Sequence, residues 1–420
     1  MLRLPTENTS DREENIMAEW QAVRLGEIVK TNQSTYSPKE NWQFVNYLDT
    51  GNITMNKIDE IQNINTAKDK LPSRARRKVK TNSIIYSTVR PNQLHYGIIK
   101  EQPDNFLVST GFTVIDVNYD KAVPDFIYYA LTKQEVTEQL QAIAEQSVSA
   151  YPSLKPSDIE NLELMLPDKK TQERIVAILR SIDEKIKENN AINNNLEQQY
   201  ISIVDNLLSK LTQYKIYSLL EVADCQNGRA FYKEGYDPNG AFVIDLGNVN
   251  TSGNFVRTAA DKYISLDRYK EPKLEKYRVY KNDIVMVMTD RKSTMELLGK
   301  VGKIYKDGYY LLNQRMYRIR AKEGINTNYL YACLNSTETS NFLKRKALGS
   351  VQKYVNTGEI NSIEIKVPSS EKMEEIASIL DPIFLQMESN ILENESLNEL
   401  RDILLPKLMS GELDVSGIDL

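Results

Sequence analysis

The sequence repeats itself at a spacing of about 200 residues, and this repeat restricts the folds open to the chain. The segment LPDKKTQERIVAIL begins at Leu166, and the similar segment VPSSEKMEEIASIL begins at Val367. Further upstream, the run VKTNSII at 79–85 resembles VYKNDIV at 279–285, and the tripeptides at 51–53 and 126–128 resemble those at 247–249 and 329–331. The chain is therefore predicted to hold a globular unit followed by a long helix, twice over.

Each globular unit has the pattern of a mixed α/β (α+β) domain. Short β-rich runs alternate with turns that contain Gly, Asn and Pro, and a helical stretch follows at 125–139 in the first unit and at 327–346 in the second. We expect an N-terminal extension at 1–17, globular units at 18–166 and 212–368, long helices at 167–211 and 369–410, and a C-terminal tail at 411–420.

The two long helices carry apolar residues in alternating steps of four and three, the pattern of a coiled-coil seam. The predicted seam comprises Ile175, Leu179, Ile186, Asn189, Asn193, Leu196, Ile203, Leu207, Ile376, Leu380, Met387, Asn390, Asn394, Leu397, Leu404 and Leu408. Its asparagines lie in the middle of each helix. Antiparallel pairing sets Asn189 against Asn394, where paired amides fix the register at some cost in stability.

Parallel pairing would align these asparagines too, so their positions alone do not set the direction. Connectivity favours two antiparallel helices that form a coiled coil with a pseudo-two-fold repeat. The alternative is that the asparagines face solvent. Arg401 falls in the seam opposite Ile182, and Pro382 is expected to kink the second helix near Asp381.

Composition excludes several classes of enzyme. The only histidine is His95, too few for zinc or iron sites built on several His ligands, and no GxSxG, GxxxxGK[ST] or GxGxxG motif is present. The two cysteines, Cys225 and Cys333, are too far apart for a zinc knuckle, and no signal peptide or membrane-spanning apolar run is found. We expect a cytoplasmic protein without a catalytic residue, bound metal or cofactor; a carboxylate-based hydrolase remains a minor alternative.

The net charge of −5 conceals basic segments that suit DNA. Basic residues dominate 68–100 and outnumber acidic ones in 212–368, whereas 369–420 is acidic. Candidate DNA-binding residues follow equivalent predicted strands or cluster nearby: Arg74, Arg76, Arg77, Lys78, Lys80, Arg90, Asn92, Gln93, His95, Asn227, Arg229, Arg291, Lys292, Ser293, Lys344, Arg345, Lys346 and Lys353. For each of them, phosphate contact, base contact and an ordinary solvated side chain are all open.

Three motifs are spread over the chain: WQAVRL at 20–25, Leu166-Pro167 with Gln172-Glu173 and Ile175, and LLPKLMSGEL at 404–413. On these motifs the chain resembles the specificity subunit of type I restriction–modification systems over nearly its whole length. It departs at Glu374-Glu375-Ile376, where the family has a Glu-Arg-Ile type of motif.

The resemblance implies that the globular units are two target recognition domains, each of which binds half of a bipartite double-stranded DNA target. It also implies that methyltransferase subunits, two per chain, dock on the helices and bring S-adenosylmethionine, and that restriction subunits bring ATP and Mg. We expect the acidic stretch 388–399 to serve docking. The competing interpretation is a non-catalytic coiled-coil adaptor that binds two protein partners; steeply salt-dependent DNA binding would distinguish the two.

Overall fold

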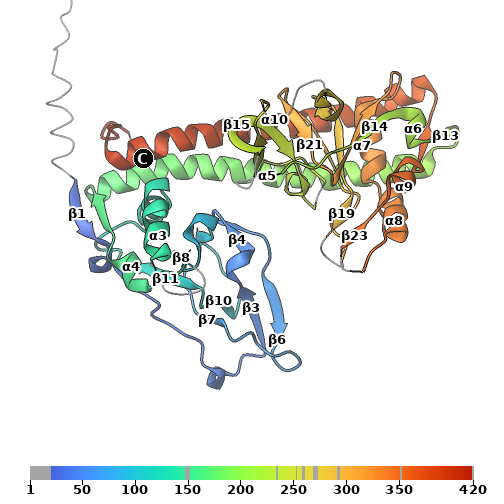
Figure 1. Cartoon of the computed structure of the whole chain (residues 1–420). Coiled ribbons are helices and arrows are strands. Elements are labelled where there is room, and N and C mark those ends of the chain that lie inside the picture. Colours follow the sequence, from blue (N-terminus) through green and yellow to red (C-terminus); the bar gives the residue numbers. More distant parts are fainter. Residues whose placement is uncertain are drawn as a thin grey trace, which may run out of the picture. The chain divides into compact units, whose positions relative to one another are not determined.

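The computed structural model describes residues 20–146, 152–232, 235–251, 253–257, 261–267, 273–290, 294–350 and 352–418. Its tertiary contacts divide the chain into two compact units (Figure 1). Unit 1 comprises Met1–Lys185 and Ser396–Leu420, and unit 2 comprises Ile186–Glu395. The predicted extension at 1–17 lies outside the described residues.

Unit 1 contains two four-stranded sheets. The first is antiparallel throughout, in the order β2 (Val29–Thr31), β11 (Phe112–Val117), β8 (Ile84–Ser87) and β9 (Tyr96–Ile98). The second has the order β6 (Gln62–Asn65), β3 (Phe44–Leu48), β10 (Phe106–Ser109) and β7 (Ala75–Arg77), and its central pair β3–β10 is parallel. Two shorter antiparallel pairs are β1 (Gln21–Arg24) with β12 (Glu163–Leu166) and β4 (Ile53–Thr54) with β5 (Lys57–Ile58).

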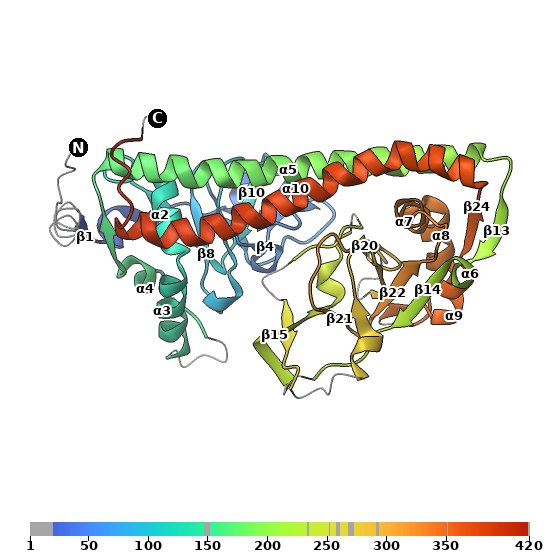
Figure 2. The ribbon, with the colours of Figure 1, turned by 90° about the horizontal axis from the view of Figure 1, so that it is seen from above.

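Unit 2 repeats the same topology (Figure 2). Its antiparallel sheet has the order β14 (Ala223–Asn227), β22 (Met316–Ala321), β18 (Ile284–Val287) and β20 (Val301–Lys303). The other sheet has the order β16 (Lys262–Ile264), β15 (Tyr236–Ile244), β21 (Tyr310–Leu312) and β17 (Arg278–Val279), again with a parallel central pair. Two-stranded pairs are β13 (Lys215–Ser218) with β24 (Glu364–Val367) and β19 (Thr289–Asp290) with β23 (Lys353–Tyr354). The predicted internal repeat of mixed α/β domains is confirmed.

The single helical stretch expected in each unit is two helices in the structure. Unit 1 has α2 (Pro124–Leu131) and α3 (Gln134–Glu145), followed by α4 (Pro156–Glu160). Unit 2 has α6 (Leu219–Val222), α7 (Thr327–Asn335), α8 (Thr337–Lys346) and α9 (Thr357–Asn361). In unit 2 the break has a local cause, because Ser336 is extended and its hydroxyl accepts a hydrogen bond from the Thr339 N–H, which starts a new helix.

The repeated word at 79–85 and 279–285 encodes a tight turn that leads into a buried strand. Asn82 and Asn282 have positive φ values of 67° and 70°, which asparagine tolerates better than most residues. The next side chain accepts a backbone hydrogen bond across the turn: Ser83 Oγ from Lys80 N at 3.0 Å, and Asp283 Oδ2 from Tyr280 N at 2.8 Å. The two segments are similar in sequence because both form the same turn, which needs a left-handed asparagine followed by a short acceptor side chain.

The long helices α5 (Lys169–Lys210) and α10 (Ser370–Ser410) run antiparallel within each unit (Figure 2). In unit 2, Asn189 Nδ2 donates to Asn394 Oδ1 at 3.0 Å, and Asn390 Nδ2 donates to Asn193 Oδ1 at 2.8 Å. In unit 1, Leu179 and Leu408 share one core, and Arg401 Nη1 lies 3.2 Å from Asp183 Oδ1. Arg401 therefore contacts the carboxylate of Asp183, the residue that follows Ile182, which the predicted register placed opposite the arginine.

The predicted seam residues differ in burial. Ten are buried, namely Ile175, Leu179, Asn189, Asn193, Ile376, Leu380, Met387, Asn390, Asn394 and Leu408. Six are half-buried, namely Ile186, Leu196, Ile203, Leu207, Leu397 and Leu404. Tyr200 and Phe384, which are almost fully buried, also pack between α5 and α10, with ring centroids 5.1 Å apart. The helix α10 continues through Pro382, whose side chain is exposed.

Over the described residues, neither these helices nor the shorter ones hold a stretch long and apolar enough to cross a membrane.

Candidate nucleic-acid interface

In unit 2, the strands of both sheets meet at the turn 313–315, between β21 and β22. The backbone of this turn is held by the ends of neighbouring strands: Asn313 N donates to Ile244 O at 3.0 Å, and Met288 N donates to Arg315 O at 3.0 Å. Just before the turn, Leu312 O accepts from Arg229 N at 3.0 Å. These bonds fix the turn against three other segments of the unit.

Unit 1 holds an equivalent turn at 109–111, between β10 and β11. Strand pairing sets Phe112 opposite Ser87 and Met316 opposite Val287, so residues 109–111 correspond to 313–315. The bond from Met288 N to Arg315 O has an equivalent here, since Thr88 N donates to Gly111 O at 2.8 Å. We call this backbone bond to the last residue of the turn the clamp. Thr110 N also donates to Arg74 O at 2.8 Å, which brings the basic strand β7 to this junction.

Beside each turn, a capped 3-10 turn carries an aspartate. Asp49 Oδ1 accepts from Thr50 N at 2.9 Å, and Asp245 Oδ1 accepts from Leu246 N at 2.7 Å. Burial opposes the charge of Asp49, but hydrogen bonds from Thr50 N–H and the Tyr47 hydroxyl, together with the Arg74 charge, hold the pKa of Asp49 below its ordinary value. This carboxylate therefore stays ionised.

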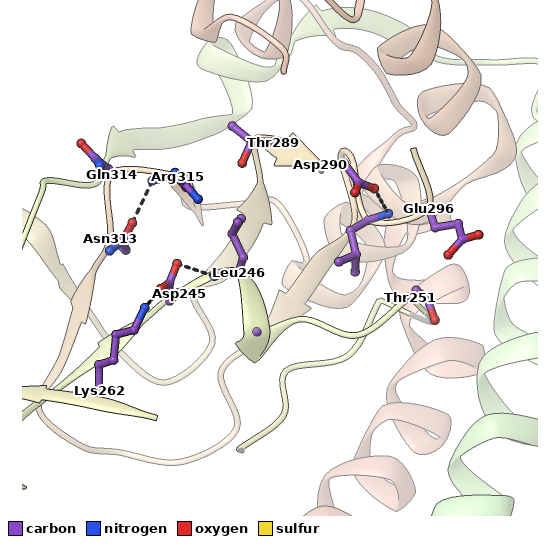
Figure 3. A pocket seen from close by; sticks show the side chains of 12 residues that line it. Asp245, Leu246, Thr251, Lys262, Thr289, Asp290, Glu296, Asn313, Gln314 and Arg315 are labelled. Atoms are coloured by element: carbon purple, nitrogen blue, oxygen red, sulfur yellow. Dashed lines mark hydrogen bonds and ion pairs between the residues drawn. The ribbon is translucent and has the colours of Figure 1, made fainter. Parts of the chain in front are cut away.

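A pocket of about 560 Å³ opens beside the turn of unit 2 (Figure 3). Its lining consists of Asp245, Leu246, Gly247, Thr251, Lys262, Thr289, Asp290, Glu296, Leu297, Asn313, Gln314 and Arg315. The turn residues lie toward one side of the view, and Asp290 and Glu296 lie toward the other. Lys262 pairs with Asp245, and Asp290 Oδ2 accepts from Leu297 N at 2.7 Å. The pocket thus offers many hydrogen-bond donors and acceptors. Over the described residues, no cluster of His, Cys, Asp or Glu suited to a metal is found.

The predicted basic residues of unit 1 fall into two groups. Arg74, Lys80, Arg90, Asn92 and Gln93 are exposed, while Arg76, Arg77, Lys78 and His95 are half-buried. Arg74 and Arg90 lie near the turn 109–111, since Arg74 O accepts from Thr110 N and Thr88, two residues before Arg90, donates to Gly111 O.

Partners remote in the sequence engage two of the half-buried residues, whereas Arg76 Nε donates to the nearby Ser73 O at 3.4 Å. Lys78 Nζ pairs with Glu40 and lies 5.1 Å from the centroid of the Trp42 ring. His95 Nδ1 lies 2.6 Å from Ile53 O, so the histidine ties its loop to β4. Sequence reasoning could not foresee these partners, because they lie about 40 residues away in the chain.

The predicted residues of unit 2 are more dispersed. Asn227 is exposed, and Arg229 is half-buried, 5.5 Å from the centroid of Phe231 and 5.6 Å from that of Tyr277. Lys353 lies opposite Asp290 in the strand register of the short sheet β19–β23, next to the pocket. Lys344, Arg345 and Lys346 end α8 and are exposed, and Lys346 Nζ lies 3.1 Å from Glu359. Arg291, Lys292 and Ser293 lie outside the described residues.

Sequence reasoning missed a cluster of arginines in unit 2. Arg318 Nη1 donates to Arg278 O at 2.8 Å, and the Arg278 guanidinium lies 4.0 Å from the centroid of Tyr309. Burial, followed by the like charge of Arg320, lowers the pKa of Arg318. The alternation of arginines in the run RMYRIR was the available signal, since alternate residues share one face of a strand.

Carboxylates in the acidic stretch 388–399 have partners within unit 2. Glu388 lies 2.9 Å from Lys281 Nζ, Glu395 lies 3.0 Å from Lys306 Nζ, and Glu393 accepts from Asn189 at 2.7 Å. These three side chains stabilise unit 2, and the expectation that the stretch serves docking stays a prediction.

Two copies of one two-sheet framework, each with a clamped polar turn, define a duplicated recognition protein. Residues 17–198 and 212–401 match the family model described as type I restriction modification DNA specificity domain, and the chain belongs to this family. The assignment to type I specificity subunits is thereby confirmed, and with it the interpretation as a DNA-recognition component without catalytic function.

Curated relatives and a solved structure agree with this family. The type I restriction enzyme HindI specificity subunit of Haemophilus influenzae is 26% identical over 464 residues, which cover 94% of this chain and 100% of the relative. The MjaIX specificity subunit of Methanocaldococcus jannaschii is 23% identical over 71% of each chain. The type I restriction–modification S subunit from M. genitalium has a similar fold, with a TM-score of 0.50, 15% identity, and coverage of 97% of this chain and 98% of that one.

Proposed function

We propose that the chain binds a two-part DNA target, one half through each unit. The observation that carries this proposal is the recurrence of one framework and one clamped turn with different side chains at the turn. Unit 1 presents Ser109, Thr110 and Gly111 where unit 2 presents Asn313, Gln314 and Arg315. A shared backbone with different polar side chains suits the reading of two different base sequences.

The target recognition domains are proposed to extend over 18–166 and 212–368, with the helices at 167–211 and 369–410 as the spacer between them. Methyltransferase subunits, two per chain, dock on the helices and supply S-adenosylmethionine; restriction subunits supply ATP-dependent cleavage. The names of the relatives as specificity subunits of type I restriction enzymes support this division of labour. The internal repeat supports the number two, because it offers a partner two similar surfaces.

The decisive experiment maps methylated bases in DNA from cells that express this chain with its methyltransferase subunit. We expect a motif in two parts, separated by a gap of constant length and free sequence. A contiguous motif would contradict the two-part proposal. Absence of methylation, combined with DNA binding that does not depend on salt, would favour a protein-binding adaptor.

Arg74 provides a test of phosphate contact in unit 1. It is exposed and lies at the turn 109–111, so Arg74→Ala is expected to reduce the salt dependence of DNA binding by about one unit of log K against log[salt]. The measurement is a salt titration of the assembled complex on its target duplex. Lys187→Ala, at an exposed position on α5, is the control and should leave the slope unchanged. Equal slopes for the two variants would remove Arg74 from the interface.

A further inference from the structure

At the turn where the two sheets meet, the repeats keep the same backbone bond but carry different side chains. The clamp from Thr88 to Gly111 in unit 1 has its counterpart in the clamp from Met288 to Arg315 in unit 2. Between the clamps, small side chains in unit 1 are replaced by an amide and a guanidinium in unit 2. A position that is structurally conserved within the molecule but chemically different is suited to determining what each unit recognises.

The turn of unit 2 is rigid. Met316 N donates to Asn313 O at 2.9 Å, and Arg315 N donates to the side-chain Oδ1 of Asn313 at 3.2 Å. The backbone at Gly228, directly after β14, also lies against the turn, since a Cβ added to Gly228 would lie 1.9 Å from Asn313 O. A fixed backbone lowers the entropic cost of presenting side chains to a ligand.

The side chains of Gln314 and Arg315 are available on this rigid turn. Gln314 is exposed and Arg315 is half-buried, and both line the pocket (Figure 3). Within the part of the chain that the structure describes, neither side chain makes a hydrogen bond. Their donors and acceptors are therefore free to meet a ligand.

The charge of the pocket disfavours a phosphate group. Among the described residues, its lining includes the carboxylates of Asp245, Asp290 and Glu296 and the basic side chains of Lys262 and Arg315, and the lysine is paired with Asp245. Carboxylates repel a phosphate, whereas they accept hydrogen bonds from the amino groups of bases. The pocket therefore suits base edges rather than the DNA backbone.

We infer that Gln314 and Arg315 read purine bases in the half-target bound by unit 2. Arginine makes paired hydrogen bonds to O6 and N7 of guanine, and glutamine makes them to N6 and N7 of adenine. This inference rests on the proposed function and assigns to one turn the specificity for one half of the target.

Unit 1 has no arginine or glutamine at these two positions. Gly111, which corresponds to Arg315, has no side chain, and an added Cβ would lie 2.7 Å from Cγ2 of Thr50. The exposed Arg90 lies two residues after Thr88, whose N–H donates to Gly111 O. The two units thus place their reading groups on different segments of the same framework.

The test compares Arg315→Ala, Arg315→Lys and Gln314→Ala in the complex with the methyltransferase subunit. Mapping of methylated motifs is expected to show relaxed purine preference at a position of one half-target only, with the other half unchanged. Binding of the original duplex should weaken about 5- to 150-fold, the range for loss of one paired contact to a base. Arg315→Lys keeps the charge but loses the paired geometry, so it should relax specificity as well.

Thr110→Ala, at the equivalent exposed position of unit 1, is the matched control and should leave the half-target of unit 2 unchanged. Thermal unfolding of each variant verifies that it remains folded. An unchanged motif in all three variants, or a salt slope that falls by about one while the motif stays the same, would assign phosphate contact at most and overturn the inference. If the wild-type complex shows no two-part motif at all, the proposed function fails instead.

Discussion

Replacement of Asp283 by alanine is expected to destabilise unit 2 by about 3 kcal/mol, because it removes a buried carboxylate that makes charge-assisted hydrogen bonds to the half-buried Arg320. Asp283 is 2% exposed, and its oxygens accept from Arg320 Nε at 2.6 Å and Nη2 at 2.8 Å. It also accepts from Tyr280 N in the turn before β18. The variant loses all three bonds at once and leaves the guanidinium of Arg320 without its carboxylate. Denaturant unfolding of the full chain, with hydrogen exchange of β18 and β22 as the local probe, measures the effect.

The repeat supplies the control for this prediction. In unit 1 the corresponding residues are Ser83 and Asp116, and Ser83 Oγ donates to Asp116 Oδ1 at 2.6 Å. Ser83→Ala removes a hydrogen bond to the Asp116 carboxylate and one from Lys80 N–H, but Asp116 keeps Lys80 Nζ at 3.7 Å, so the cost should be smaller, about 1.5 kcal/mol. The double variant Asp283→Ser with Arg320→Asp transplants the pair of unit 1 into unit 2 and should recover part of the loss. An Asp283→Ala variant within about 0.5 kcal/mol of wild type would mean that solvent screens this pair.

The parts of the fold that the sequence predicts well depend on local chemistry. The turn before β8 and β18 requires a left-handed asparagine and a short acceptor side chain, so its residues repeat visibly at 79–85 and 279–285. The long helices are also predictable from local sequence, because apolar residues at a period of 3.5 indicate which side chains face the partner helix. The direction of the helices followed from connectivity, and the hydrogen bonds of Asn189 and Asn193 agree with it.

The rest depends on partners that are remote in sequence. Lys78 looked like one of several equivalent basic residues, but Glu40 and Trp42 engage it. Gln314 and Arg315 were not predicted as DNA-binding residues, because two adjacent polar residues do not form a sequence pattern that indicates a site. Their place became evident only when strand pairing aligned the turn with that of unit 1 and put the pocket beside it.

Replacement of Asn189 and Asn193 by leucine on α5 alone is expected to destabilise unit 2 by about 2–5 kcal/mol, because each amide orphaned on the other helix costs about 1–3 kcal/mol. Asn390 Nδ2 would lose Asn193 Oδ1, and the main-chain oxygen of Met387 would lose the donor that lies 3.3 Å away. Asn394 would lose the bond from Asn189. Denaturant unfolding with hydrogen exchange of the helix amides measures the loss.

Replacement of all four seam asparagines by leucine should give the opposite sign. No buried amide is then orphaned, because Gln386 and Asn190, which each lose one partner, are exposed to water. The buried Oδ1 of Asn189 that lacks a partner among the described residues disappears and apolar contact replaces it, so stability should equal or exceed that of wild type. The expected loss is in specificity: without polar pairs, the helices can shift register or associate with a second chain, which light scattering and hydrogen exchange detect. If the four-leucine protein is stable and monodisperse and keeps the wild-type register of α5 against α10, the asparagines do not set that register. If the two-leucine protein is as stable as wild type, the amides on α10 find other hydrogen-bond partners. The two variants together therefore separate the stability of the helix pair from its alignment, the property on which a fixed gap between two half-targets depends.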